Sequence, residues 1–238
     1  MNNLNLPPYS LPITFLFLCA IMVLRYFLVC GLFLWMIKKI NPPALDNTPL
    51  NLLQKRRDIR WSILSSLVFA ASGVVMVRLV QWGESRVYLN FSDYPLWYLP
   101  VSFILYLFVQ DSYFYWTHRL MHKVGFRTIH LAHHESRSPS AWTSFAFHPW
   151  EALIQSLILP LMIVVIPVHL GVLGLFLFTM SAFGVTNHLG VEIYPRFLER
   201  SLGVITARHH HIHHQNLKKN FGLFFNFWDR LMGTEQDG

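Results

Sequence analysis

Three histidine-rich boxes carry the most distinctive chemistry of this sequence. Thirteen histidines occur, none before residue 118, and the boxes read HRLMH at 118–122, HLAHH at 130–134 and HHIHH at 210–214. On a helix, residues three and four apart share a face, so each box directs imidazoles to one side. Imidazole is the commonest metal ligand in proteins. One tetrahedral zinc needs only four ligands, so eight aligned histidines indicate two metal ions close together.

The helices around the first two boxes must direct these imidazoles toward a common site. A helix that continues from the preceding apolar segment would place Asp111 and Tyr115 on the same face as the first box. Asp111 is therefore expected either to hold a histidine tautomer or to be an interfacial polar residue. A turn near Gly125 is expected to lead into a second helix that carries the 130–134 box.

The remaining histidines are expected to play different parts. His188, at the end of a long apolar stretch, is a candidate further ligand, with an interfacial hydrogen-bonded histidine as the alternative. His148 could support a ligand or start a helix. His209 could support its box, whereas His211 points away from the main face of that box. His169 is expected to be incidental.

The composition indicates an integral membrane protein. Hydrophobic residues make up 53% of the 238 and charged residues only 13%, about half the share usual in soluble domains. The net charge is +7, but the basic residues gather at the ends of apolar segments, which fits membrane topology better than nucleic-acid binding. Cys19 and Cys30 lie in the first apolar segment and are expected to be buried thiols, without a disulfide.

Four apolar segments are expected to enter the membrane, where about 20 residues suffice for one span. They cover residues 11–37, 61–80, 96–116 and 153–188. The last segment is too long for one span and is divided at Pro167 to Gly171, so it forms either two spans or a hairpin. Arg25 is the single charge of the first segment. It is expected to face other helices, headgroups or water, and a bound anionic headgroup is a sharper alternative.

The charges between these segments predict the topology. The loop over residues 38–60 carries six basic and two acidic residues and belongs in the cytoplasm by the positive-inside rule, whereas residues 81–95 are slightly acidic. All three boxes then reach the cytoplasmic face. Residues 1–10 lack the basic start of a signal peptide, so the first segment is expected to be retained. The sequence thus predicts an all-α integral membrane bundle of about four spans or span-hairpins, with a cytosolic histidine-rich helical cap. Residues 1–95 would form the N-terminal spans and basic loop, and residues 96–238 the catalytic domain.

Ligand type alone does not name the metal, because imidazole suits iron, zinc, copper and nickel. A two-metal site at a bilayer surface faces lipid chains and dissolved oxygen. A di-iron centre there could reduce oxygen and remove hydrogen from an unactivated C–H bond, with the protein supplying position and exclusion of water.

The order and spacing of the boxes resemble the fatty acid hydroxylase/sterol desaturase superfamily. The resemblance extends to WTSFAFHPWE at 142–151, NHLG at 187–190 and NFGLFFNFWDRLMGT at 220–234. Acyl-CoA desaturases have four residues between the histidines of the first box, against three here, and fit less well.

This resemblance implies oxygen-dependent hydroxylation or desaturation of a membrane lipid by a helical membrane enzyme with two iron ions. The implied ligands are His118, His122, His130, His133, His134, His188, His210, His213 and His214. The implied supporting residues are Asp111, His148, His209 and Asp229.

The resemblance also predicts the partners and location of the chain. Electrons are expected from a separate donor, such as a cytochrome b5-like protein, a ferredoxin or a reductase. Arg127, Lys218 and Lys219 either dock that donor or serve as positive-inside anchors. The expected location is a bacterial inner membrane or the endoplasmic reticulum.

Two rival functions remain open at this point. A zinc enzyme would act without oxygen and need a general base, for which Glu135 or Glu151 could serve; zinc could also occupy a purified sample of an iron enzyme. A non-catalytic metal carrier ranks last, because no polar path crosses the apolar segments.

Overall fold

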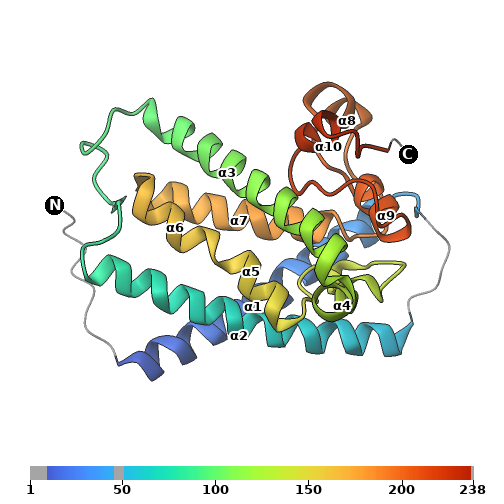
Figure 1. Ribbon diagram of the computed structural model, residues 1–238, viewed down its shortest axis with the longest axis horizontal. Helices are drawn as coiled ribbons and strands as arrows, with labels where there is room; N and C mark the ends of the chain where they lie inside the picture. Colours follow the sequence, from blue (N-terminus) through green and yellow to red (C-terminus); the bar gives the residue numbers. More distant parts are fainter. Residues whose placement is uncertain (1–9, 46–50, 237–238) are drawn as a thin grey trace.

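A cap of short elements lies at one end of a bundle of longer helices (Figure 1). The computed structural model describes residues 10–45 and 51–236, and most of these residues are helical. The expectation of a mainly helical chain is confirmed. The elements, in order, are α1 (Leu11–Ile40), α2 (Leu52–Gln81), β1 (Val87–Tyr88), α3 (Tyr98–Leu120), the π-helix η1 (Met121–His130), α4 (Leu131–His134), the 3₁₀-helix η2 (Ala141–Thr143), α5 (Pro149–Ser156), α6 (Ile158–Val165), β2 (Val168–His169), α7 (Leu170–Thr186), α8 (Arg196–Leu202), α9 (Ala207–Gln215) and α10 (Phe227–Leu231).

The two N-terminal helices are long and apolar enough to cross a membrane, as judged by length and composition. Both α1 and α2 have 30 residues, or about 45 Å of helix against a hydrocarbon core about 30 Å thick. Large apolar side chains are exposed on α1, among them Leu16, Phe17 and Leu28. Such a surface is typical of contact with lipid.

The prediction of a loop over residues 38–60 is wrong at both ends. Helix α1 continues to Ile40 and ends where Asn41 adopts a left-handed conformation. Helix α2 begins at Leu52, where the side chain of Asn51 accepts a hydrogen bond from the backbone of Leu53. Helices can run on beyond an apolar stretch because their backbone bonds do not depend on apolar side chains. Residues 46–50 of the expected loop, and residues 1–9 of the expected N-terminal segment, lie outside the described residues.

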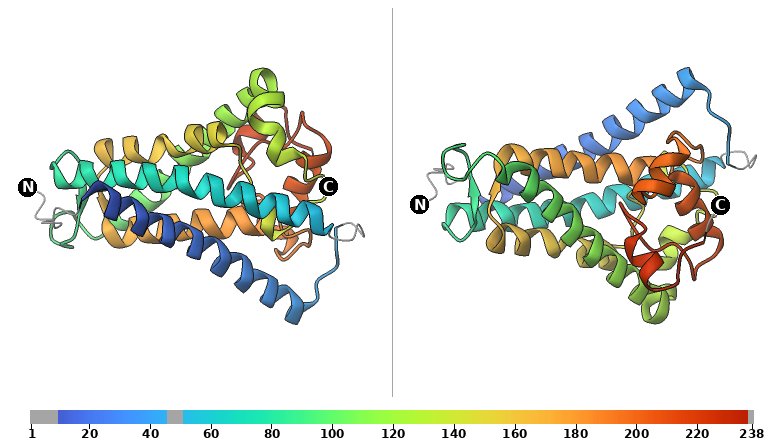
Figure 2. Two further views of the ribbon diagram at one scale, coloured as in Figure 1. Left: turned by 90° about the horizontal axis from the view of Figure 1, so that it is seen from below. Right: turned by 90° about the horizontal axis from the view of Figure 1, so that it is seen from above.

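The long apolar segment 153–188 folds as a hairpin whose two ends return to the capped end of the bundle (Figure 2). Helices α5 and α6 lead away from the cap, and α7 returns after a break at Pro167, as the sequence predicts. At the far end, β1 pairs with β2 in parallel, with Val87 opposite Val168. These two short strands are exceptions to the all-α expectation. His169 lies in β2, away from the boxes, as expected.

Helix α3 passes directly into a π-helix, so the expected turn near Gly125 is wrong. The ten residues of η1 connect α3 with α4 without leaving helical conformation. A π-helix closes i→i+5 hydrogen bonds, is rare, and often occurs at functional sites. The wider turn changes which residues share a face, so the first two boxes meet without a separate loop.

The bundle and the cap share one packed interior. Phe224 of the C-terminal segment belongs to the same core cluster as Tyr106 of α3 and Phe176 of α7. Cys30 of α1 is buried, and its thiol donates a hydrogen bond to the carbonyl of Ala141. Cys19 and Cys30 are both free, as expected. The cap is thereby held at a fixed position on the helices.

Candidate metal centre

The structure brings all nine predicted ligands together in two clusters of imidazoles. Within each cluster, the candidate ligand atoms lie within 4.8 Å of one another. The first cluster contains His118, His122, His130, His134 and His213. The second cluster contains His133, His188, His210 and His214. Their imidazoles come from α3, η1, α4, α9 and the end of α7, so the site unites segments that are far apart in sequence.

The spacing of the ring nitrogens fits metal coordination. In the first cluster the Nε2 atoms of His118 and His130 are 3.0 Å apart. In the second, the Nε2 atoms of His210 and His188 are 2.9 Å apart. A metal about 2.1 Å from each nitrogen places adjacent ligand nitrogens about 3 Å apart when the ligands meet at right angles.

The hydrogen bonds on the opposite side of the rings fix which nitrogen faces inward. The Nδ1 atoms of His118 and His213 donate to the carbonyls of Phe221 and Lys219, at 2.9 and 2.6 Å. His188 donates in the same way to the carbonyl of Gly184, at 2.7 Å. A carbonyl only accepts, so in the neutral rings the Nε2 atoms carry lone pairs. Lone pairs aimed at one another need a cation between them, and the donor set therefore fits a metal.

Burial keeps these rings neutral. It lowers the pKa of His122 to about 2, with a smaller contribution from repulsion by His118. Burial also lowers the pKa of His130, His134 and His214 well below the ordinary histidine value, and neighbouring imidazoles lower it further. A neutral imidazole is the form that binds metal, so the clusters are ready to bind at neutral pH.

Glu151 is the carboxylate that holds a cluster histidine. Its Oε1 atom accepts a hydrogen bond from Nδ1 of His130 at 2.8 Å, and both side chains are 2% exposed. We expected Glu151 only as the base of a zinc enzyme. Its place in the first turn of α5 turns it toward η1. The HPWE segment could have indicated this position, because its histidine and proline are typical of a helix start and place Glu151 in the first turn.

Asp229 supports the first cluster through the backbone of the C-terminal segment. Its two carboxylate oxygens accept hydrogen bonds from the amides of Phe221 and Gly222, at 2.9 and 2.8 Å. Phe221 in turn accepts the hydrogen bond of His118. A Cβ atom at Gly222 would lie 2.5 Å from the carbonyl oxygen of Phe225, so this close turn requires glycine.

The expected role of Asp111 as the partner of a histidine is wrong. Its Oδ1 atom accepts backbone hydrogen bonds from Leu223, Phe224 and Phe225, the shortest 2.7 Å from Phe224. Asp111 does share a helical face with His118, but the C-terminal segment reaches it first. It fastens that segment to α3.

His148 and His209 lie outside both clusters, and of the two roles expected for His148 the structure shows the helix start and not the support of a ligand. His148 caps the start of α5, where its Nδ1 atom accepts a hydrogen bond from the amide of Trp150. His209 is fully buried on the other face of α9, with Nδ1 3.2 Å from Glu199. Their sequence positions fitted the family pattern, but neighbouring positions on a helix face different ways.

Comparison with known proteins agrees with this arrangement. The fatty acid hydroxylase family model matches residues 103–234, more than half of the chain, and includes every histidine of the two clusters. The chain belongs to the fatty acid hydroxylase family. The resemblance inferred from the histidine boxes is thereby confirmed.

Several family relatives act on sterols according to their names. The lathosterol oxidase of Mus musculus is 32% identical over 185 residues, covering 76% of this chain and 61% of the relative. The delta(7)-sterol 5(6)-desaturase of Gibberella zeae is 31% identical over 156 residues, covering 65% and 47%. Methylsterol monooxygenase 1 of Rattus norvegicus is 31% identical over 143 residues, covering 59% and 49%. The chain thus spans about three fifths of the length of the lathosterol oxidases. No solved structure matches the chain significantly.

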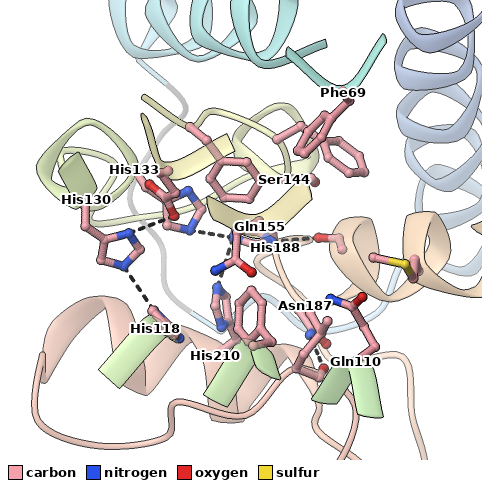
Figure 3. A pocket seen from close by; sticks show the side chains of 17 residues that line it. Phe69, Gln110, His118, His130, His133, Ser144, Gln155, Asn187, His188 and His210 are labelled. Atoms are coloured by element: carbon pink, nitrogen blue, oxygen red, sulfur yellow. Dashed lines mark hydrogen bonds and ion pairs between the residues drawn. The ribbon is translucent and has the colours of Figure 1, made fainter. Parts of the chain in front are cut away.

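In this family member a largely apolar cavity adjoins both clusters (Figure 3). Its volume is about 90 Å³, and its histidines are His118, His130, His133, His188 and His210. Half of the twelve other wall residues have large apolar side chains, namely Phe69, Phe114, Phe145, Phe147, Met180 and Leu223. Such a wall accepts a hydrocarbon and excludes water next to the imidazoles.

The segment after the second box is fastened to α2 by a buried carboxylate. Asp58 is fully buried and accepts hydrogen bonds from the hydroxyls of Ser136 and Thr143, both at 2.8 Å. Arg57 contacts the same carboxylate at 3.3 Å and also pairs with Glu135 at 3.1 Å. Basic residues that were expected in a free loop therefore help to hold the cap on the bundle.

Proposed function

We propose that this chain is a membrane oxidoreductase that hydroxylates or desaturates a lipid C–H bond with two iron ions. The observation that carries the proposal is the convergence of nine imidazoles, eight of them buried, in two adjacent clusters beside an apolar cavity. The sterol enzymes among its relatives support a membrane lipid, including a sterol, as substrate. When bound, the iron pair would supply the redox reactivity that activates dioxygen toward an unactivated C–H bond.

The side chains of this protein would bind the iron ions and orient the substrate. The five imidazoles of the first cluster would hold one iron and the four of the second cluster the other. Glu151 and the carbonyls of Phe221, Lys219 and Gly184 keep the protons of four rings on Nδ1. The aromatic wall holds the hydrocarbon and keeps bulk water away from the reacting carbon.

The overall reaction needs an external electron donor. Hydroxylation combines a C–H bond, dioxygen, two electrons and two protons to give an alcohol and one water. Desaturation breaks two C–H bonds on adjacent carbons, uses the same dioxygen, electrons and protons, and gives an alkene and two waters. We propose a separate donor, namely a cytochrome b5-like protein, a ferredoxin or a reductase, with Arg127, Lys218 and Lys219 on the side that receives it.

We also propose the topology that the charges predict. The chain would cross the membrane in about four spans or span-hairpins, with the histidine clusters and the C-terminus in the cytoplasm. Residues 1–95 would form the N-terminal membrane part, and residues 96–238 the catalytic part. The membrane would be a bacterial inner membrane or the endoplasmic reticulum. A cysteine introduced at an exposed position of the cap, as in Lys218→Cys, and a labelling reagent that cannot cross membranes would test the side on which the cap lies.

Metal analysis and oxygen uptake test the function directly. A sample purified without oxygen is expected to contain about two irons per chain. With a reductant and the lipid extract of its host, it should consume oxygen and produce a new lipid alcohol or alkene. A protein that binds only zinc and converts lipid without consuming oxygen would contradict the proposal and favour the non-oxidative alternative.

A further inference from the structure

A second cavity lies inside the helix bundle, next to the histidine cavity. Its volume is about 140 Å³, and cavities of about this size hold a molecule such as benzene. The two cavities have common walls, formed by Phe69, Gln110, Phe145, Gln155 and Met180. The two cavities are therefore adjacent, one beside the imidazoles and the other among the helices.

Among the residues that line the second cavity, three buried polar atoms have no hydrogen-bond partner. They are Nε of Arg25, Oε1 of Gln110 and Oε1 of Gln155. Gln110 is only 1% exposed, and Figure 3 shows that the side chains of both glutamines lie at the wall of the histidine cavity. Native proteins rarely leave buried polar atoms unpaired, because doing so costs the full desolvation of each group. Unpaired atoms at a cavity wall indicate a polar ligand.

The charge of Arg25 strengthens this indication. Its guanidinium donates one hydrogen bond to the hydroxyl of Ser181 at 2.9 Å and lies 5.0 Å from the ring centre of Phe145. In the described part of the chain, no carboxylate forms an ion pair with it. A charged side chain in a membrane helix is costly and commonly marks a binding site. The contacts of Arg25 direct it toward α7 and the segment between η2 and α5, which agrees with the expectation that it faces other helices.

We propose that Arg25 and one glutamine, Gln110 or Gln155, bind the hydroxyl group of a neutral lipid alcohol, which is the substrate. This inference rests on the proposed lipid oxidation and specifies its substrate class. A hydroxyl can donate to a glutamine oxygen and accept from Nε–H of Arg25, so it satisfies both kinds of unpaired atom. A hydroxyl has one proton and pairs with one glutamine oxygen, whereas a carboxylate only accepts and would leave both glutamine oxygens unpaired. The apolar remainder of the two cavities holds the hydrocarbon of the same molecule.

Matched pairs of lipids test this inference by binding. The probes are radiolabelled cholesterol and oleyl alcohol, each compared with its methyl ether, together with oleate, on the purified full chain in detergent. For at least one pair, the alcohol should bind roughly tenfold more tightly than the ether, which has lost its donor. One of the two substitutions Gln110→Leu and Gln155→Leu should remove most of that preference, because the hydroxyl donates its single proton to one glutamine oxygen. The control Phe69→Leu, which changes an apolar part of the same wall, should keep it.

The comparison of alcohol and ether on the wild-type protein tests the inference even if a variant fails to fold. Equal binding of alcohol and ether in both pairs, tighter binding of oleate, or no binding of either alcohol would each overturn the inference. A preference for the alcohol that survives both glutamine substitutions would overturn the assignment of these residues. Binding is measured without turnover, and iron is counted separately. A failure of the proposed oxidation would therefore show as missing iron or oxygen uptake, with the binding preference intact.

Discussion

Nδ1 of His130 donates a hydrogen bond to Glu151 across 2.8 Å, between a π-helix and the first turn of α5. Both groups are buried, where an unpaired carboxylate would be costly. The contact therefore couples the position of α5, part of the membrane hairpin, to the direction of a cluster histidine. Packing between the hairpin and the bundle thus contributes to the geometry of the first cluster.

We predict that Glu151→Gln weakens iron binding at the first cluster by about 10- to 100-fold. The amide keeps the shape of the side chain but loses the negative charge that increases the basicity of His130. Competition with a chromophoric chelator under anaerobic conditions would measure the change. Glu135→Gln is the matched control, because Glu135 is 44% exposed and pairs with Arg57 instead of a histidine. Equal iron affinity in Glu151→Gln and wild type would show that the contact does not tune the metal.

We predict that His133→Ala loses the iron of the second cluster and abolishes turnover, while the protein still inserts into the membrane. The cluster has four imidazoles, and its Nε2 atoms include the pair His133–His188 at 3.2 Å. Iron content by atomic emission and the lipid extract of a host that expresses the variant are the measurements. His211→Ala, in the third box but outside both clusters, should keep iron and activity. Full iron content and turnover in His133→Ala would remove His133 from the ligand set.

The metal-ligand role of the boxes could be predicted from the sequence, because histidines at helical spacing lie on the same side of a helix. That pattern placed His118 and His122 on one side of a helix, and the structure indeed brings them within 3.3 Å. The partners of the rings could not be predicted in the same way. The carbonyls of Phe221 and Lys219 are backbone atoms, which every residue has, so the residue type does not indicate this role. The predicted partner of Asp111 is wrong because a shared helical face shows on which side of the helix a side chain lies, but not which group lies nearest to it.

The limits of the helices were predictable only in part. Apolar composition gives the minimum length of a span, and it located α1, α2, α3 and the hairpin. Apolar composition does not show how far a helix extends into polar sequence, as α2 does before residue 61. The π-helix of η1 also has no hydropathy signal, because i→i+5 bonding depends on backbone geometry and tertiary contacts.

We predict that Asp229→Asn lowers the stability of the cap by about 1–3 kcal/mol and reduces its iron content. The carboxylate accepts from two amides and from the hydroxyl of Thr234 at 2.7 Å. An asparagine amide would turn a donor toward one of these donors, and the carbonyl of Phe221 would then hold His118 less firmly. The unfolding temperature and the iron content of the purified variant are the measurements. Asp93→Asn, on the exposed loop before α3, is the control. Unchanged stability and iron content would contradict the support role.

We predict that the metal-free protein loses stability as the pH falls below about 6.5, the ordinary pKa of histidine in the unfolded chain. Burial lowers the pKa of His122 to about 2 and that of His130 well below 6.5. The folded state thus excludes protons that the unfolded state binds. The contribution of these rings is complete above about pH 6.5 and is lost progressively toward their folded-state pKa.

The unfolding temperature of the metal-stripped protein in detergent, followed from about pH 7.5 to about pH 4.5, would measure this loss. Bound iron should delay it, because a metal at Nε2 competes with the proton until acid releases the metal. Removing several cluster histidines, as in a His122→Gln and His130→Gln double variant, should flatten the pH dependence of the metal-free protein. Replacing His148 and His169, which lie outside the clusters, should not. An unfolding temperature independent of pH across this range would mean that the buried rings do not exclude protons, and with that the tautomer argument for a metal between them would fail.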